Sequence, residues 1–186
     1  MIKVRIFNGK RLSMQHTKSK ERVSKLGEVY TPAPIVDDMH ALIGTKKVAP
    51  GIWSDPTMIY LEPTCGNGQF VVAAVQKKID SGLTPYEAVN TVFGMDIMQD
   101  NVDECRERVY ALVKPLVRGK RAMDDIRCVI VNNIFPVKDS LAFMAAGKWE
   151  AKRFFKDDPT ETGGQVLCAE TRAGVLERIN KNGVLI

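Results

Sequence analysis

Residues 62–70 combine an acid, a thiol and two glycines in a spacing that suits ligand binding. They read Glu-Pro-Thr-Cys-Gly-Asn-Gly-Gln-Phe, between a short apolar run and a helical pattern of apolar residues. In α/β folds, a strand, a G-x-G turn and a helix wrap nucleotide-like ligands. The glycines let the backbone approach, and free N–H groups at the helix start face the ligand. The segment therefore predicts a nucleotide-type site; the alternative is a turn that only connects strand and helix.

A second acid, Asp96, closes the apolar segment 91–96, which predicts a strand. An acid at the end of the second strand of a nucleotide-binding sheet can accept both ribose hydroxyls. The next residue, Ile97, can lie against the face of the base. The alternative for Asp96 is an exposed residue that caps the following helix.

Three segments together resemble the N6-adenine DNA methyltransferases that use S-adenosyl-L-methionine (SAM), with the gamma-type motif order. Gly-Glu-Val-Tyr-Thr-Pro at 27–32 looks like motif X of that family, and residues 62–70 look like motif I. Gly-Met-Asp-Ile at 94–97 is similar to the segment that holds the ribose. The residues of these segments are most similar to those of small methylase-like subunits of restriction systems. The resemblance therefore implies a protein encoded by a phage or a mobile element.

The resemblance covers residues 18–140 and implies SAM as the cofactor. The backbone of the glycine turn would cradle the methionine part, and Glu62 would attract its amino group. Thr31 would close over its carboxylate. Asp139 would accept a hydrogen bond from the adenine amine, unless it is an ordinary turn aspartate. The implied cofactor residues are Tyr30, Thr31, Pro32, Glu62, Thr64, Cys65, Gly66, Gly68, Phe70, Asp96, Ile97 and Asp139.

The catalytic motif of that family, (N/D/S)-P-P-(Y/F/W), is missing, since the chain contains no Pro-Pro pair. The nearest string contains Asn133, Phe135 and Pro136 in a different order and is a weak catalytic candidate. Two functions therefore remain open. One is a DNA adenine methyltransferase, acting alone or as a homodimer. The other is a non-catalytic SAM-binding module, either a partner of a methyltransferase or restriction subunit or an anti-restriction factor. A methyltransferase for RNA or a metabolite is a third possibility.

Positive charge is concentrated at the N-terminus. Residues 1–26 hold eight basic residues and one acid, a net charge of +7, whereas the whole chain carries +5. A basic arm on a slightly acidic body predicts DNA binding through the phosphates. A solvated tail that only improves solubility is the alternative.

The order of apolar segments predicts an α/β fold: a Rossmann-like SAM methyltransferase core with a shortened parallel sheet and an N-terminal helical basic extension. The division expected is 1–26 for the extension, 27–140 for the SAM-binding core, and 141–186 for a segment that completes or caps the sheet. The expected helices span about 33–43, 71–80 and 100–117, with a further short helix that starts at Thr84-Pro85, and the expected strands span about 58–62, 91–96 and 128–131.

Composition excludes several other classes. No apolar run approaches the roughly 20 residues of a membrane span, and no signal peptide is recognisable. The four cysteines form no C-x-x-C pair that would bind zinc. The expectation is a cytoplasmic protein with reduced, mostly buried thiols and no metal centre.

Overall fold

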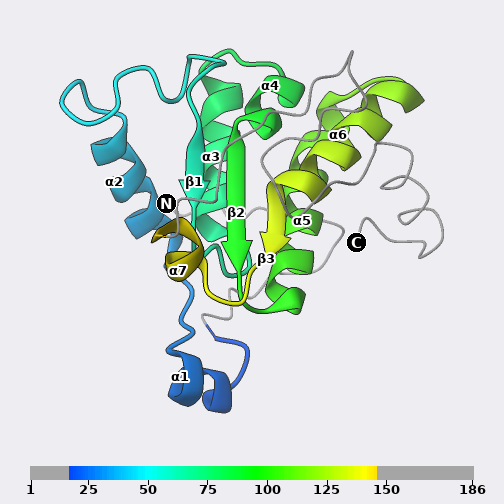
Figure 1. The fold of residues 1–186 in the computed structure, drawn as a ribbon. Coiled ribbons are helices and arrows are strands. Elements are labelled where there is room, and N and C mark those ends of the chain that lie inside the picture. The colour runs from blue at the N-terminus through cyan, green and yellow to red at the C-terminus, as the bar shows by residue number, and fades with distance from the viewer. Residues whose placement is uncertain (1–16, 146–186) are drawn as a thin grey trace, which may run out of the picture.

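The computed structural model describes residues 17–145 as a mixed α/β structure with a three-stranded parallel sheet (Figure 1). The strands β1 (Tyr60–Glu62), β2 (Val92–Asp96) and β3 (Ile134–Pro136) lie in that order across the sheet. The predicted α/β class with parallel strands is therefore confirmed. The finer assignment to the SAM methyltransferase fold stays a prediction.

The register brings the carboxyl ends of the three strands to one edge. Glu62 pairs with Gly94 of β2, and Asp96 pairs with Pro136 of β3. Ligands of open parallel sheets bind outside this edge. Two of the predicted site acids therefore belong to the edge where a ligand is expected.

Helices surround the sheet and connect its strands (Figure 1). In Figure 1, α3 and α5 lie behind the sheet and α6 lies beside β3. The helical elements are α1 (Lys20–Leu26), α2 (Ala33–Ile43), α3 (Gln69–Asp80), α4 (Pro85–Asn90), α5 (Gln99–Val113), the 3-10 turn η1 (Lys114–Leu116), α6 (Lys120–Asn133) and α7 (Ser140–Ala145).

Apolar spacing and caps explain most of these helices. The buried residues of α3 include Val71, Ala74 and Val75, which recur at the helical spacing and face α5 and the sheet. Helix α4 starts with a capping box, in which the Thr84 side chain and the Glu87 side chain each bond the backbone of the other. The expected helices at 33–43 and at about 71–80 are confirmed to within two residues, and the short helix expected from Thr84-Pro85 is found at Pro85–Asn90.

The expected strand at 128–131 is wrong, because these residues belong to α6. A short apolar run fits a buried strand and a buried helix equally well. Here the run is the last part of a 14-residue helix, and its residues from Cys128 to Asn133 are all buried between the sheet and neighbouring helices. The third strand follows directly at 134–136, so Asp139 lies three residues after its end.

Alternation along β2 separates two apolar clusters. Val92 belongs to the main cluster, which includes Val71 of α3 and Val109 of α5. Met95 packs with Phe135 and other apolar residues in a smaller second cluster. The sheet is thus buried on both sides, which is usual for parallel sheets.

The sequence pattern also favours a short strand or disorder at 2–7, a helix or a hairpin at 143–155, a strand at 165–169 and a helix at 170–179. These predictions lie outside the described residues, for 143–155 in large part. Among the residues that the structure describes, no helix is both long and apolar enough to cross a membrane.

Candidate functional site

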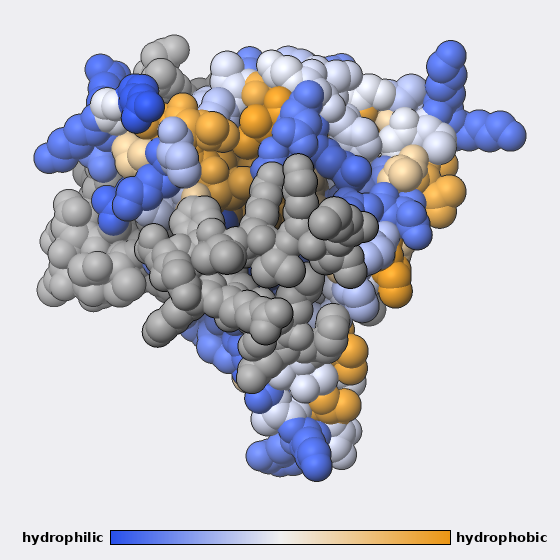
Figure 2. Space-filling model, turned by 180° about the vertical axis from the view of Figure 1, so that it is seen from behind, coloured by the Kyte–Doolittle hydropathy of each residue, from blue (hydrophilic) through white to orange (hydrophobic). Residues whose placement is uncertain are grey.

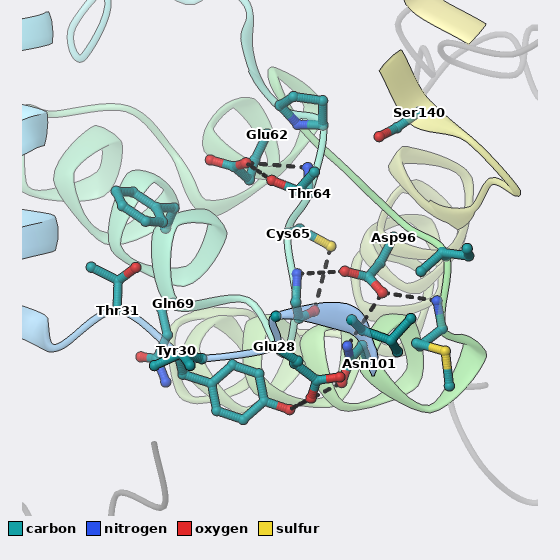
Figure 3. Close-up of a pocket in the computed structure, with 18 of the residues that line it drawn as sticks. Glu28, Tyr30, Thr31, Glu62, Thr64, Cys65, Gln69, Asp96, Asn101 and Ser140 are labelled. Atoms are coloured by element: carbon teal, nitrogen blue, oxygen red, sulfur yellow. Dashed lines mark hydrogen bonds between the residues drawn. The ribbon is translucent and has the colours of Figure 1, made fainter. Parts of the chain in front are cut away.

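A pocket of about 560 Å³ opens at the carboxyl edge of the sheet (Figure 3). Four separate segments line it: 26–31 before the sheet, 62–70 after β1, 96–101 after β2, and 138–140 after β3. Its volume falls within the usual range of small-molecule sites, roughly 300–1,000 Å³. The pocket therefore joins the three sequence segments on which the prediction rested.

Ten of the twelve predicted cofactor residues line this pocket: Tyr30, Thr31, Glu62, Thr64, Cys65, Gly66, Phe70, Asp96, Ile97 and Asp139. The other two, Pro32 and Gly68, stand next to it as the N-cap residues of α2 and α3. Residues that lie up to 109 positions apart in the sequence are thus brought together.

Ten further lining residues were not predicted: Leu26, Gly27, Glu28, Val29, Pro63, Gln69, Met98, Asn101, Lys138 and Ser140. Glu28 and Val29 belong to the segment 27–32 that resembles motif X, so their closeness to Tyr30 in the sequence could have indicated them. Asn101 had one available signal: it stands in the first turn of the helix that follows Asp96. Nothing in the pattern pointed to Lys138 or Ser140.

The glycine turn is fixed to β2 and packed against α5. The Cys65 N–H donates to the Met95 carbonyl at 2.7 Å, and the Gly68 N–H donates to the Cys65 carbonyl at 2.8 Å. Gly68 has a φ of +90°, and a Cβ there would meet Cys105 Sγ at 2.5 Å. Only glycine fits this position, both for its backbone and for the contact.

Asp96 links the glycine turn to the start of α5 through its two carboxylate oxygens. Its Oδ2 accepts from the Gly66 N–H at 2.8 Å. Its Oδ1 accepts from the Met98 N–H at 2.8 Å and from Asn101 Nδ2 at 3.2 Å (Figure 3). A carboxylate has about four acceptor positions, so one of those on Oδ2 remains for a ligand.

Glu62 presents one oxygen to the turn. Oε1 accepts from both the N–H and the hydroxyl of Thr64, each at 3.2 Å. No described residue bonds to Oε2. Burial raises the pKa of Glu62, and the two bonds from Thr64 partly offset this effect. A cation bound beside Glu62 would favour its ionised form.

Tyr30 connects the segment before the sheet to α5. Its hydroxyl lies 2.6 Å from Glu28 Oε1 and 3.1 Å from Asn101 Oδ1 (Figure 3). Burial, followed by the hydrogen bond to Glu28, raises the pKa of Tyr30, so the phenol stays neutral and can donate. Through Asn101, this contact continues to Asp96.

A second set of contacts from α5 holds the start of α3. Arg108 Nη1 donates to the Asn67 carbonyl at 2.7 Å, and its Nη2 donates to Gln69 Oε1 at 3.2 Å. Asn67 Nδ2 in turn donates to Glu104 Oε1 at 2.8 Å. These positioning contacts have no sequence signature, because they depend on how α3 and α5 pack.

The weak catalytic candidates are not brought into the pocket. Asn133 is buried at the end of α6, where its Nδ2 donates to the Val89 carbonyl at 3.1 Å. Phe135 is buried in the second cluster, and Pro136 ends β3. None of the three lines the pocket.

Asp139 lines the pocket but already has a structural role. Its Oδ1 accepts from the Ala142 N–H at 2.8 Å, as a residue that caps α7 does. The other carboxylate oxygen has no hydrogen bond from any described residue. Both possibilities for Asp139, a ligand contact and a capping residue, are thus compatible with its position.

The charge and polarity of the lining residues suit a cationic ligand with one flat apolar part. Glu28, Glu62, Asp96 and Asp139 line the pocket, whereas Lys138 is its one basic lining residue among those described. Ile97 adds an apolar surface that is 58% exposed.

The described part of the basic arm is largely paired within the molecule. Lys18 and Arg22 form ion pairs with Asp100, and Lys25 pairs with Glu21. DNA binding by the arm stays a prediction. Cys65 and Cys105 are buried free thiols, and a hydrogen bond with Cys105, followed by burial, raises the pKa of Cys65. Cys168 lies outside the described residues.

Comparisons with models of protein families, with curated proteins and with solved structures returned no match.

Proposed function

We propose that this protein binds SAM in the pocket at the carboxyl edge of the sheet and is a methyltransferase-like protein directed at adenine in DNA. The observation that carries the proposal is the convergence of Glu62, Asp96 and the glycine turn on one pocket. Exposed Ile97 beside Asp96 supplies a surface for the adenine ring.

The ligand and the pocket match in charge. SAM carries an ammonium, a sulfonium and a carboxylate, so its net charge is positive. Oε2 of Glu62 would accept from the ammonium group. The carboxylate would lie near Thr31, at the end of the pocket formed by the segment before the sheet. The same acids would favour SAM over its demethylated product, which has lost the sulfonium charge.

Asp96 would hold the ribose, although it cannot accept two new bonds without a rearrangement. One hydroxyl can use the remaining position on Oδ2. The second needs the position on Oδ1 that Asn101 occupies at 3.2 Å, the longest of the three bonds to Asp96. We therefore expect the Asn101 amide to turn away or to share this oxygen when the ribose binds.

For methyl transfer, SAM would supply an activated methyl group: the amine nitrogen would bond to the methyl carbon as the carbon–sulfur bond breaks, S-adenosylhomocysteine would leave as a neutral thioether, and the proton of the nitrogen would pass to water. The residues of the pocket would contribute orientation, because holding two reactants in line removes much of the entropic barrier. No described residue is assigned as a catalytic base.

Calorimetric titration of the full-length protein with SAM tests the cofactor. We expect binding by the wild type and a loss of about 1–3 kcal/mol in Asp96→Ala, the scale of lost bonds to a charged group. Asp80→Ala, an exposed acid at the end of α3 away from the pocket, is the matched control. Absence of binding to both SAM and S-adenosylhomocysteine at millimolar concentration would falsify the proposal.

A non-catalytic SAM-binding module is the second candidate, and a specific observation favours it. The chain has no Pro-Pro pair, and Asn133, Phe135 and Pro136 do not line the pocket. Such a module would act beside a true methyltransferase or against a restriction system.

Transfer of tritiated methyl groups from SAM to unmethylated DNA separates the two candidates. The protein is assayed alone and together with a candidate methyltransferase or restriction subunit. Incorporation by the protein alone supports the enzyme. Binding of SAM without incorporation by the protein alone supports the module, whether or not incorporation appears when the partner is added.

A further inference from the structure

Charged contacts, with little apolar packing, hold α1 to the rest of the molecule. This helix contains no buried residue. Leu26 at its end is 49% exposed, and Val29 just after it is 59% exposed. Figures 1 and 2 show α1 projecting from the bottom of the body. Since burial of apolar surface is the main stabilising term in folding, α1 needs another source of anchoring.

Ion pairs provide that anchoring. Arg22 Nε donates to Glu28 Oε2 at 2.6 Å, and its Nη1 bonds to Asp100 at the start of α5. Lys18 Nζ lies 2.9 Å from Asp100 Oδ2 and 3.1 Å from Glu104 Oε2. The Arg22 and Glu28 side chains are only 18% and 10% exposed, so their pair is partly shielded from solvent.

The same segment forms one wall of the pocket. Leu26 to Thr31 line it directly. From Glu28, polar contacts run to the Tyr30 hydroxyl, whose one proton serves Glu28 Oε1 and Asn101 Oδ1, and from the Asn101 amide to Asp96. Asp96 in turn accepts from the Gly66 N–H in the glycine turn. A continuous set of polar contacts thus joins Arg22 to the turn.

We propose that residues 18–31 form a strap over the pocket, latched by the ion pairs of Lys18 and Arg22 with α5, and that Arg22 is a positioning residue for ligand binding. Opening the latch would remove the Tyr30–Thr31 wall and release Asn101 from one of its partners. Ligand binding and strap closure would favour each other, since coupling between two sites is reciprocal. The identity of the ligand as SAM rests on the proposed function.

Because the acids on the α5 side of the latch, Asp100 and Glu104, are 51% and 40% exposed, salt should weaken it. The Debye length falls from about 10 Å at 0.1 M salt to about 3 Å at 1 M. A strap held by apolar packing would show no such dependence. Salt therefore sets how much of the time the wall of the pocket is in place.

Hydrogen exchange on the ligand-free, full-length protein tests the latch. Arg22→Ala should speed exchange about tenfold at the Gly27 amide, which bonds to the Val23 carbonyl, and measurably at the Gly66 amide. The control is Lys25→Ala, which removes an ion pair made only within α1. Equal effects of the two substitutions at Gly27 and Gly66 would overturn the proposal.

A double-mutant cycle of Arg22→Ala and Asp100→Ala separates the latch from other roles of Asp100 at the start of α5. If the two residues act through their pair, the double variant should exchange no faster at Gly66 than the faster single variant. Multiplicative effects would argue against the latch.

SAM titration of the same variants tests the coupling to the pocket. Raising the salt from about 0.05 to 0.5 M should lower the affinity for SAM in the wild type by a factor about ten times larger than in Arg22→Ala. Lys25→Ala should show the same salt dependence as the wild type. Identical salt dependence in all three proteins would refute the coupling. If no variant and no wild-type protein binds SAM, the proposed function fails, whereas the exchange data still decide whether the strap exists.

Discussion

His40 and Lys78 are fully buried side chains, each with one hydrogen-bond partner within residues 17–145. His40 Nε2 lies 3.0 Å from the Tyr60 hydroxyl, and the ring packs against Trp53 and Phe70. Lys78 Nζ donates to the Met58 carbonyl at 2.9 Å. Burial lowers the pKa of His40 to about 4 and that of Lys78 to about 8. Burial thus disfavours the charged form of each group in the folded protein. The free energy of unfolding therefore depends on pH.

Protonation of His40 should destabilise the fold below pH 6.5. Its pKa is about 4 in the folded protein and about 6.5 unfolded, so between these values the unfolded state binds more protons. The stability contributed by neutral His40 is present above pH 6.5 and is lost as the pH falls toward 4. We expect the free energy of unfolding by urea to fall by about 2 kcal/mol from pH 7 to 5.

The same titration on His40→Gln identifies the source of this loss. The variant should be less stable at pH 7, because the packed ring is gone, but its stability should change little between pH 7 and 5. A loss of about 2 kcal/mol that persists in the variant would assign the effect to other groups.

At the scale of elements, the packing of α3 against α5 decides whether the glycine turn keeps its shape. Gly68 stands where α3 begins, and its Cα faces Cys105 of α5. Arg108 of α5 bonds the turn from the same side. The turn is therefore as much a product of this helix pair as of its own sequence.

Gly68→Ala should lower the free energy of unfolding by about 2 kcal/mol or more. The new methyl group would meet Cys105 Sγ at 2.5 Å, and the φ of +90° is unfavourable for alanine. Gly82→Ala is the matched control, since Gly82 has a φ of +101° and no atom lies within 4 Å of the place its Cβ would take. Both variants are compared by thermal unfolding. Equal losses of stability in Gly68→Ala and Gly82→Ala would show that the contact with Cys105 of α5 adds nothing to the cost of a positive φ.

At the scale of the whole molecule, the distribution of charge bears on the DNA hypothesis. Lys18 and Arg22 are paired with acids of α5 and with Glu28. The lysines and arginines of the first 16 positions are Lys3, Arg5, Lys10 and Arg11. If the protein binds DNA through the arm, we expect these four residues to make most of the phosphate contacts.

Changing all four to Gln should flatten the dependence of DNA affinity on salt. Each lost phosphate contact reduces the slope of log K against log salt by about 0.9. The double variant Lys18→Gln and Arg22→Gln should change this slope less. Fluorescence anisotropy with a labelled duplex measures both, and an unchanged slope in the fourfold variant would return the arm to the role of a solvated tail.

Local sequence patterns determined much of this protein. The capping box at Thr84, the apolar spacing of α3 and the acid that ends β2 depend on neighbouring residues, so they could be predicted from the sequence. Glycine spacing similarly indicated where a ligand could approach the backbone. These features share one physical origin: backbone preferences and side-chain periodicity act over a few residues.

Only the tertiary structure decided the rest. The apolar run 128–131 fits a strand or a helix, and its burial among the surrounding elements made it part of α6. Several contacts of the site join residues that are distant in sequence. Asp96 accepts from the Gly66 N–H, Arg108 donates to the Asn67 carbonyl, and Arg22 pairs with Asp100. Such contacts arise when the chain folds back on itself, and no local preference specifies them. The sequence by itself predicts a nucleotide-type ligand beside the glycine turn, and this stays a prediction, whereas the packing of α3, α5 and residues 18–31 determined how the pocket is built.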